Sequence, residues 1–109
     1  MSSEVKKLEA QISKLEEQIE LGKAIERLQE NRDFKTVIAQ AFMKDESLRY
    51  LETSADTNIS DKERAGALAI AQVGSHLKRY IAASLQLAKV AEDGIQEYKD
   101  HLIAVASEE

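Results

Sequence analysis

The sequence predicts an all-α protein: a long helical hairpin with an N-terminal coiled-coil segment, two short helices at the bend and one long C-terminal helix. Three observations support this fold class. Proline is absent, and charged residues make up 32% of the 109 residues, a composition typical of long helices. Apolar residues recur every three or four positions along two stretches, as they do on one face of a helix. Aromatic residues reach only 5%, so we expect an aliphatic core.

The first predicted helix covers residues 3–31. It makes up most of the first of three predicted segments, residues 1–31, and the three segments are expected to form one structural unit. Its N-terminal half contains a heptad repeat, in which apolar residues hold the a and d positions. These candidate interaction residues are Val5, Leu8, Ile12, Leu15 and Ile19. Gly22 takes the next d position, and the apolar spacing then resumes out of phase. In a parallel homodimer, the g and e positions of the heptads would bring no opposite charges together. An antiparallel or intramolecular partner helix is therefore a serious alternative to a parallel homodimer.

Residues 32–59 are predicted to hold the two short helices and a loop. Asn31 can adopt the left-handed conformation that ends a helix, and Asp33 can cap the next one. That helix is expected to run from Phe34 to about Met43. Its expected buried face consists of Phe34, Val37, Ile38, Ala41 and Phe42. Because both phenylalanines of the protein lie here, we expect this helix to form the centre of the core.

The other short helix is predicted from Glu46 to about Thr53. Asp45 can cap it, and Leu48 and Leu51 are expected to be buried. Residues 54–59 follow as a loop, because they are rich in side chains that bond their own backbone.

Residues 60–109 are predicted to form one long helix from Ser60 to about Val105. Ser60 and Glu63 have the spacing of a capping box. An apolar stripe follows at intervals of three and four. It consists of Ala67, Ile70, Val73, Leu77, Tyr80, Ile81, Ser84, Leu87, Ala88, Ala91, Ile95, Tyr98 and Leu102. We expect a second helix to approach closely at the small residues Gly66, Ala67, Ala71 and Gly74.

Charge and composition disfavour several function classes. The net charge is −5, and no segment is basic enough to follow a phosphate backbone, so nucleic acid is not an expected partner. There is no cysteine and no run of membrane-spanning length, so neither disulfides nor a membrane partner is expected. The sequence contains no glycine-rich phosphate loop and no serine nucleophile elbow. We therefore expect neither enzyme activity nor a cofactor.

The two histidines do not predict a metal centre. His76 and His101 would be about 37 Å apart on one helix, too far to share an ion. Glu97 and His101 are four residues apart, but the Glu-x-x-His spacing of bundle metal sites is absent. A solvated His101 is the simpler interpretation.

Lys78, Arg79 and Tyr80 are the remaining candidate interaction residues. Together they could contact an acidic partner or nucleic acid. The alternative, which we favour, is that Lys78 and Arg79 extend over a core-facing Leu77 and Tyr80.

Three runs of the sequence resemble small tailed-bacteriophage proteins from the virion-structure gene region. The runs are 28–35 (LQENRDFK), 63–68 (ERAGAL) and 76–80 (HLKRY). The resemblance covers most of the chain after the heptad segment and implies a head, portal-associated or scaffolding component. It carries over no functional residues.

The sequence thus predicts a non-enzymatic structural or assembly protein that acts through helix–helix contacts. Its expected partners are further copies of itself, a larger virion protein, or both. The expected location is the host cytoplasm or the virion, because no apolar signal region is seen. The alternative hypothesis is a phage-encoded inhibitor that binds a host enzyme or defence complex through an acidic helical surface.

Overall fold

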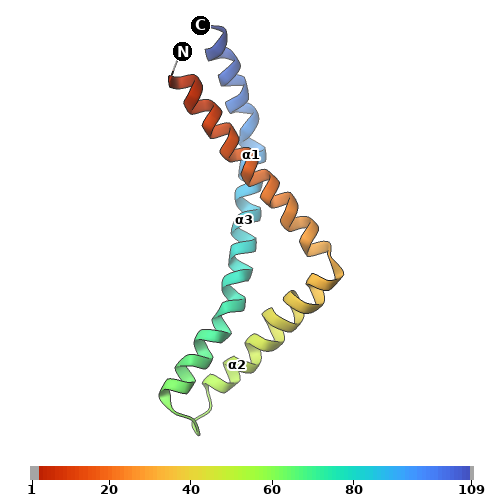
Figure 1. Cartoon of the computed structure of the whole chain (residues 1–109), viewed down its shortest axis with the longest axis vertical. Helices are drawn as coiled ribbons and strands as arrows, with labels where there is room; N and C mark the ends of the chain where they lie inside the picture. The colour runs from red at the N-terminus through yellow and green to blue at the C-terminus, as the bar shows by residue number, and fades with distance from the viewer. Residues whose placement is uncertain (1–2, 109) are drawn as a thin grey trace. The chain divides into compact units, whose positions relative to one another are not determined.

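The computed structural model describes residues 3–108, and every regular element among them is helical (Figure 1). The elements are α1 (Ser3–Glu30), the π-helix η1 (Phe34–Glu46), α2 (Ser47–Ser54) and α3 (Asp61–Ser107). The predicted fold class is confirmed. The contacts divide the chain into two compact units, which we call the terminal unit (residues 1–26 and 83–109) and the central unit (27–82).

The terminal unit is an antiparallel pair formed by the start of α1 and the end of α3 (Figure 1). Its apolar heptad residues are buried at Val5, Leu8 and Ile12. Near the other end of the pair, a Cβ added to Gly22 would lie only 2.3 Å from the Cβ of Ala88. The glycine at this d position therefore allows the two helices to approach closely. The intramolecular arrangement, left open by the sequence, is the one that the structure adopts.

The central unit contains an unusual element, because η1 is a π-helix of 13 residues. A π-helix closes i→i+5 hydrogen bonds, so it needs more residues for each turn than an α-helix. Two side-chain hydrogen bonds have this spacing. Gln40 donates to Asp45 Oδ1 at 2.9 Å, and the Ser47 hydroxyl donates to the Phe42 carbonyl at 3.3 Å.

The wider turn changes which residues face inward. Ala41 would return to within roughly 20° of Phe34 in an α-helix, but a turn of roughly 4.4 residues places it roughly 150° away. Ala41 is accordingly exposed, and Val37 is 57% exposed. The prediction that both lie on the buried face is wrong. Phe34, Ile38 and Phe42 are half-buried, so this helix is not the centre of a buried core.

The boundaries of the short helices also differ from the prediction. Asn31 ends α1 without a left-handed backbone, since no non-glycine residue within 3–108 has a positive φ. Its side chain accepts the Phe34 N–H at 2.9 Å, so Asn31 takes the capping role expected of Asp33. Asp45 caps nothing, because η1 continues directly into α2 and Glu46 has helical φ and ψ. The two short helices are thus one continuous helical segment.

The loop and the start of α3 match the prediction. In the loop, the Asn58 N–H donates to Asp56 Oδ1 at 2.8 Å, a side-chain turn that follows the end of α2. The capping box is present: the Glu63 N–H donates to the Ser60 hydroxyl at 3.1 Å. Glu63 reaches back to that same hydroxyl, which donates to its Oε1 at 3.0 Å. Residues 61–107 then continue as one helix.

The predicted close approach at small residues of α3 is found at three of the four positions. Ala67 and Ala71 are buried, and a Cβ on Gly74 would lie 2.5 Å from the Ser47 hydroxyl and 3.1 Å from the Met43 Cα. Gly74 therefore allows η1 and α2 to pack on α3. At Gly66, by contrast, a Cβ would meet nothing within 4 Å.

Candidate protein-binding surface

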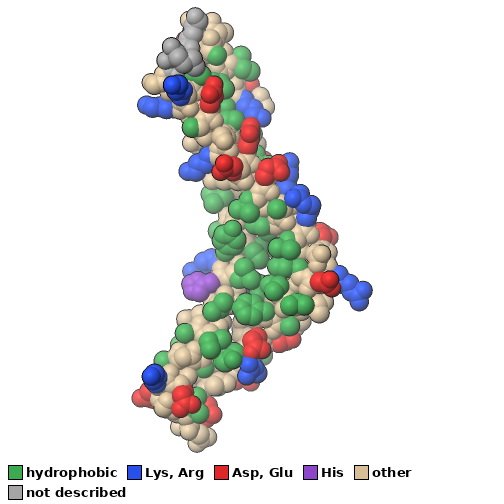
Figure 2. All heavy atoms as spheres, in the orientation of Figure 1, with side chains coloured by type: hydrophobic (Ala, Val, Ile, Leu, Met, Phe, Trp, Pro, Cys, Tyr) green, Lys and Arg blue, Asp and Glu red, His purple; other side chains and the backbone are tan. Residues whose placement is uncertain are grey.

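The central unit leaves large apolar side chains exposed on several helices. Figure 2 shows hydrophobic side chains gathered over this part of the molecule. The exposed set in residues 27–82 consists of Leu28, Val37, Leu48, Leu51, Leu68, Ile70, Val73 and Tyr80. Leu48 and Leu51 belong to it at 56% and 51%, so the prediction that α2 buries them is wrong. At the close contact with Gly74 it is Ser47, and not the neighbouring Leu48, that lies against α3.

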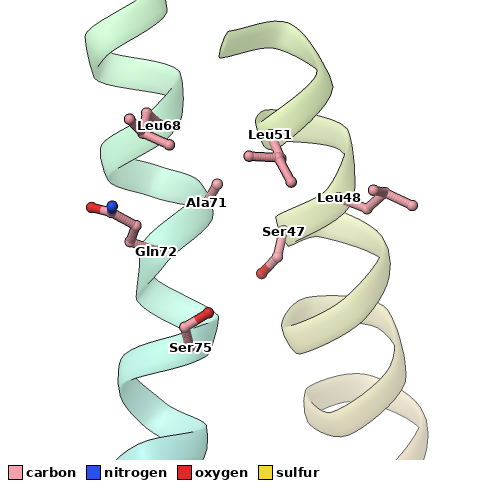
Figure 3. Close-up of a pocket in the computed structure, with 7 residues that line it drawn as sticks. All are labelled: Ser47, Leu48, Leu51, Leu68, Ala71, Gln72 and Ser75. Atoms are coloured by element: carbon pink, nitrogen blue, oxygen red, sulfur yellow. The ribbon is translucent and has the colours of Figure 1, made fainter. Parts of the chain in front are cut away.

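A groove between α2 and α3 collects part of this apolar surface (Figure 3). It has a volume of about 410 Å³. Its lining residues are Ser47, Leu48, Leu51, Leu68, Ala71, Gln72 and Ser75. Leu51 and Ala71 point toward each other from the facing helices, while Leu48 points away from α3 at the outer edge (Figure 3). An apolar floor with a few hydroxyl and amide groups is suited to an apolar segment of another protein.

Charged side chains close in sequence to the groove residues pair locally, with partners three residues away. Arg49 donates to the Glu46 carboxylate and lies with its guanidinium 4.4 Å from the centroid of the Tyr50 ring. The Glu46 hydrogen bond and the interaction with Tyr50 raise the pKa of Arg49. Arg64 donates to Asp61 one turn away on α3. These pairs neutralise charge locally and leave the leucines as the main feature of the groove.

Lys78, Arg79 and Tyr80 are all exposed on α3. Tyr80 is 56% exposed and Leu77 is half-buried, so the favoured prediction of a core-facing Tyr80 is wrong. The basic pair therefore lies beside an exposed aromatic ring, a residue type that is enriched at the centre of protein interfaces.

The heptad residues have a different place in the structure. Val5, Leu8 and Ile12 are buried in the terminal unit, and Leu15 and Ile19 are half-buried there. The seam that the sequence offered as an interaction surface is thus occupied by residues 83–108 of the same chain. Sequence reasoning missed the leucines of the groove, because it expected Leu48 and Leu51 to be buried and did not include Leu68 in the apolar stripe of the long helix.

The terminal unit also places His101 beside a carboxylate. The His101 Nε2 lies 3.6 Å from Glu4 Oε1, with both side chains more than half exposed. Glu97, Tyr98 and His101 line a shallow pocket of about 290 Å³. Within residues 3–108, no three His, Asp or Glu side chains are placed to hold a metal ion together.

Comparison with protein-family models, curated proteins and solved structures found no match to this chain. Among the helices of residues 3–108, none is both long enough and apolar enough to cross a membrane. The candidate site therefore rests on the geometry of the groove and on the exposed apolar side chains.

Proposed function

We propose that this protein is a non-enzymatic structural or assembly component of a bacteriophage particle: a head, portal-associated or scaffolding adaptor that acts through helix–helix contacts. One observation carries the proposal: the groove between α2 and α3 displays Leu48, Leu51 and Leu68, each more than 40% exposed. Contiguous exposed apolar surface rimmed by polar residues marks a protein interaction site. The phage context comes from the sequence resemblance.

In this function the groove receives an apolar helix of a larger virion protein. Complete burial of an exposed leucine contributes about 1.5 to 3 kcal/mol, and because these three leucines are already about half buried, a bound segment would gain about half of that value from each. The polar groups of Ser47, Gln72 and Ser75 in the lining can fix the orientation of the bound segment.

The test is quantitative recovery of the protein with purified virions. The expected result is a fixed stoichiometry per particle that survives a salt wash, because an apolar contact is weakly screened. Leu51→Asp is expected to reduce the bound amount at least about tenfold, since a carboxylate in an apolar groove costs more than 1.4 kcal/mol.

Val37→Asp is the matched control. Val37 is exposed to a similar extent in the same unit but does not line the groove, so this variant is expected to bind virions like the wild type. Equal loss for both variants, or absence of the wild-type protein from virions, would contradict the proposal.

A second candidate function is supported by the charge of the terminal unit. Residues 1–26 and 83–109 contain twelve acidic and six basic residues, against eight acidic and nine basic in the central unit. An acidic helical surface is suited to a basic partner, as in an inhibitor of a host enzyme or defence complex. Binding to one host protein, lost with rising salt and with no protein in virions, would favour this candidate.

A further inference from the structure

The groove between α2 and α3 has two different ends. Leu51 and Leu68 lie toward one end, and Ser75 lies at the other (Figure 3). Four residues before Leu68 on α3, Arg64 is paired with Asp61. The charge of Arg64 is therefore balanced within the chain, and charge at the end of Ser75 is arranged differently.

Two basic side chains of α3 follow the groove beyond Ser75. Lys78 lies seven residues after Ala71, and Arg79 lies seven residues after Gln72. Positions seven residues apart complete nearly two turns, so each basic residue stays within roughly 20° of a residue that lines the groove. The separation along the helix is about 10 Å. Both basic side chains are exposed and lie in the central unit with the groove.

A third basic residue lies beside the same end of the groove on the facing segment. Lys44 is exposed and comes directly after Met43 and three residues before Ser47. Met43 and Ser47 are the residues that a Cβ on Gly74 would meet, so this part of the chain lies against α3 next to Ser75. We call the three basic residues the basic end of the groove: Lys44, Lys78 and Arg79.

The positive charge of the basic end is not neutralised within the described chain. None of the ion pairs among residues 3–108 includes a residue of the basic end. Two carboxylates follow Lys44 directly, but Asp45 accepts a hydrogen bond from Gln40, and Glu46 accepts one from Arg49. On α3, residues 65–82 include no acidic residue. A partner that places carboxylates here would gain attraction without displacing an existing ion pair.

We propose that the groove binds a helix that is apolar along one face and acidic at one end, with its carboxylates against the basic end. The occupant is a segment of the partner virion protein, and charge complementarity determines its chemistry. Lys78 and Arg79 lie about two turns from the lining residues of α3, so carboxylates about two turns from the apolar anchors lie against them. The charge then fixes the direction of the bound helix. This inference rests on the proposed function and deepens it by naming the chemistry of the partner.

Two synthetic helices with the same leucine-lined face test the charge of the partner. One carries glutamates about two turns from the leucines, and the other carries lysines at the same positions. Both are stapled on the outer face so that they are equally helical, and each is made with the charged turn at either terminus to cover both directions of binding. Fluorescence anisotropy with the full chain measures the dissociation constants.

The glutamate helix is expected to bind at least about threefold more tightly than the lysine helix at about 50 mM salt, in one of the two directions. This preference should shrink at about 0.5 M salt, because exposed ion pairs are screened. Leu51→Asp is expected to weaken both helices, since the apolar anchors occupy the groove.

Reversal of charge at the basic end provides the decisive comparison. The double variant Lys78→Glu with Arg79→Glu is expected to prefer the lysine helix. Arg32→Glu with Lys35→Glu is the matched control, because it changes the net charge of the same unit equally at exposed residues that do not line the groove. This control is expected to keep the preference of the wild type. Circular dichroism checks that each variant retains its helicity.

Several outcomes would overturn the inference. They are binding of neither helix, the same change of preference in both double variants, and binding of a double-stranded DNA probe at the basic end in place of the helices. A wild-type dimer in light scattering that the Lys78→Glu, Arg79→Glu variant dissociates would also overturn it, by identifying a second copy as the occupant.

Failure of this inference can be distinguished from failure of the proposed function. Equal binding of both helices, lost in Leu51→Asp, would overturn the inference and leave the proposed function standing. Preference for the glutamate helix, with no protein recovered in virions, would overturn the proposed function and leave the charge preference of the groove intact.

Discussion

The terminal and central units differ in how they treat their apolar residues. The terminal unit buries Val5, Leu8 and Ile12 in a regular antiparallel seam, and Gly22 meets Ala88 where the helices come closest. In the central unit no residue of η1 or α2 is buried. Of the thirteen large apolar side chains exposed within residues 3–108, eight belong to the central unit. The terminal unit buries much of its apolar face within the chain, and the central unit leaves much of its apolar face exposed.

The charge follows the same division. The terminal unit has a net charge of −6 and the central unit has +1. Excess negative charge on the terminal unit opposes association between copies of that unit, whereas a near-neutral apolar surface favours association. The heptad segment, the clearest sequence signal of assembly, is therefore buried within the chain, while the central unit carries most of the exposed large apolar side chains.

The largest expected effect on stability comes from shortening a buried side chain in the antiparallel seam of the terminal unit. Ile12→Ala should lower the free energy of unfolding by about 2 to 4 kcal/mol, because it opens a cavity at a buried position. Leu51→Ala, at a side chain 51% exposed, should change it by less than about 1 kcal/mol. Urea unfolding followed by circular dichroism measures both. Similar losses for the two variants would remove the distinction between the units.

Gly22→Ala tests whether glycine is needed for the close approach of α1 and α3. Alanine normally favours a helix, but here its Cβ would lie 2.3 Å from that of Ala88, so we expect roughly 1 to 3 kcal/mol of destabilisation. The double variant with Ala88→Gly should recover most of this loss, since it removes the opposing atom. Gly94→Ala is the control, with open space around the new methyl group, and should stabilise the protein by up to about 1 kcal/mol.

Adjacent lysine substitutions test the π-helical period of η1. Ile38→Lys should cost about 1 to 2 kcal/mol, because Ile38 is half-buried, whereas Val37→Lys should cost less than about 0.5 kcal/mol. An α-helix would bury both positions, so comparable losses would indicate α-helical rather than π-helical structure. Thermal unfolding at equal protein concentration distinguishes these outcomes.

Ser60→Ala gives the smallest expected effect, about 1 kcal/mol, by removing the side-chain acceptor of the Glu63 N–H. Faster amide hydrogen exchange in the first turn of α3, with unchanged exchange in the later turns of that helix, would locate the change at the cap. Thr57→Ala, at an exposed loop residue, provides the comparison. Unchanged exchange at Glu63 would show that the cap hydrogen bond contributes nothing to stability.

Features that depend on neighbours along the chain could be predicted from the amino-acid sequence alone. The absence of proline and the apolar period predict the helices, and hydroxyl and carboxylate spacing predicts the cap at Ser60 and Glu63. The loop after Ser54 follows from side chains such as Asp56 that bond their own backbone. These interactions span a few residues, so local sequence is enough to specify them.

The tertiary structure decided what depends on contacts between distant segments. Only the pairing of residues 3–26 with 83–108 shows that the heptad seam is filled within the chain. The π-helical turn of η1 exposes Val37 and Ala41, and the approach of Met43 and Ser47 to Gly74 leaves Leu48 pointing away from α3. A periodic pattern predicts which residues share a face of a helix. Packing between helices determines the number of residues in each turn and which apolar face is buried.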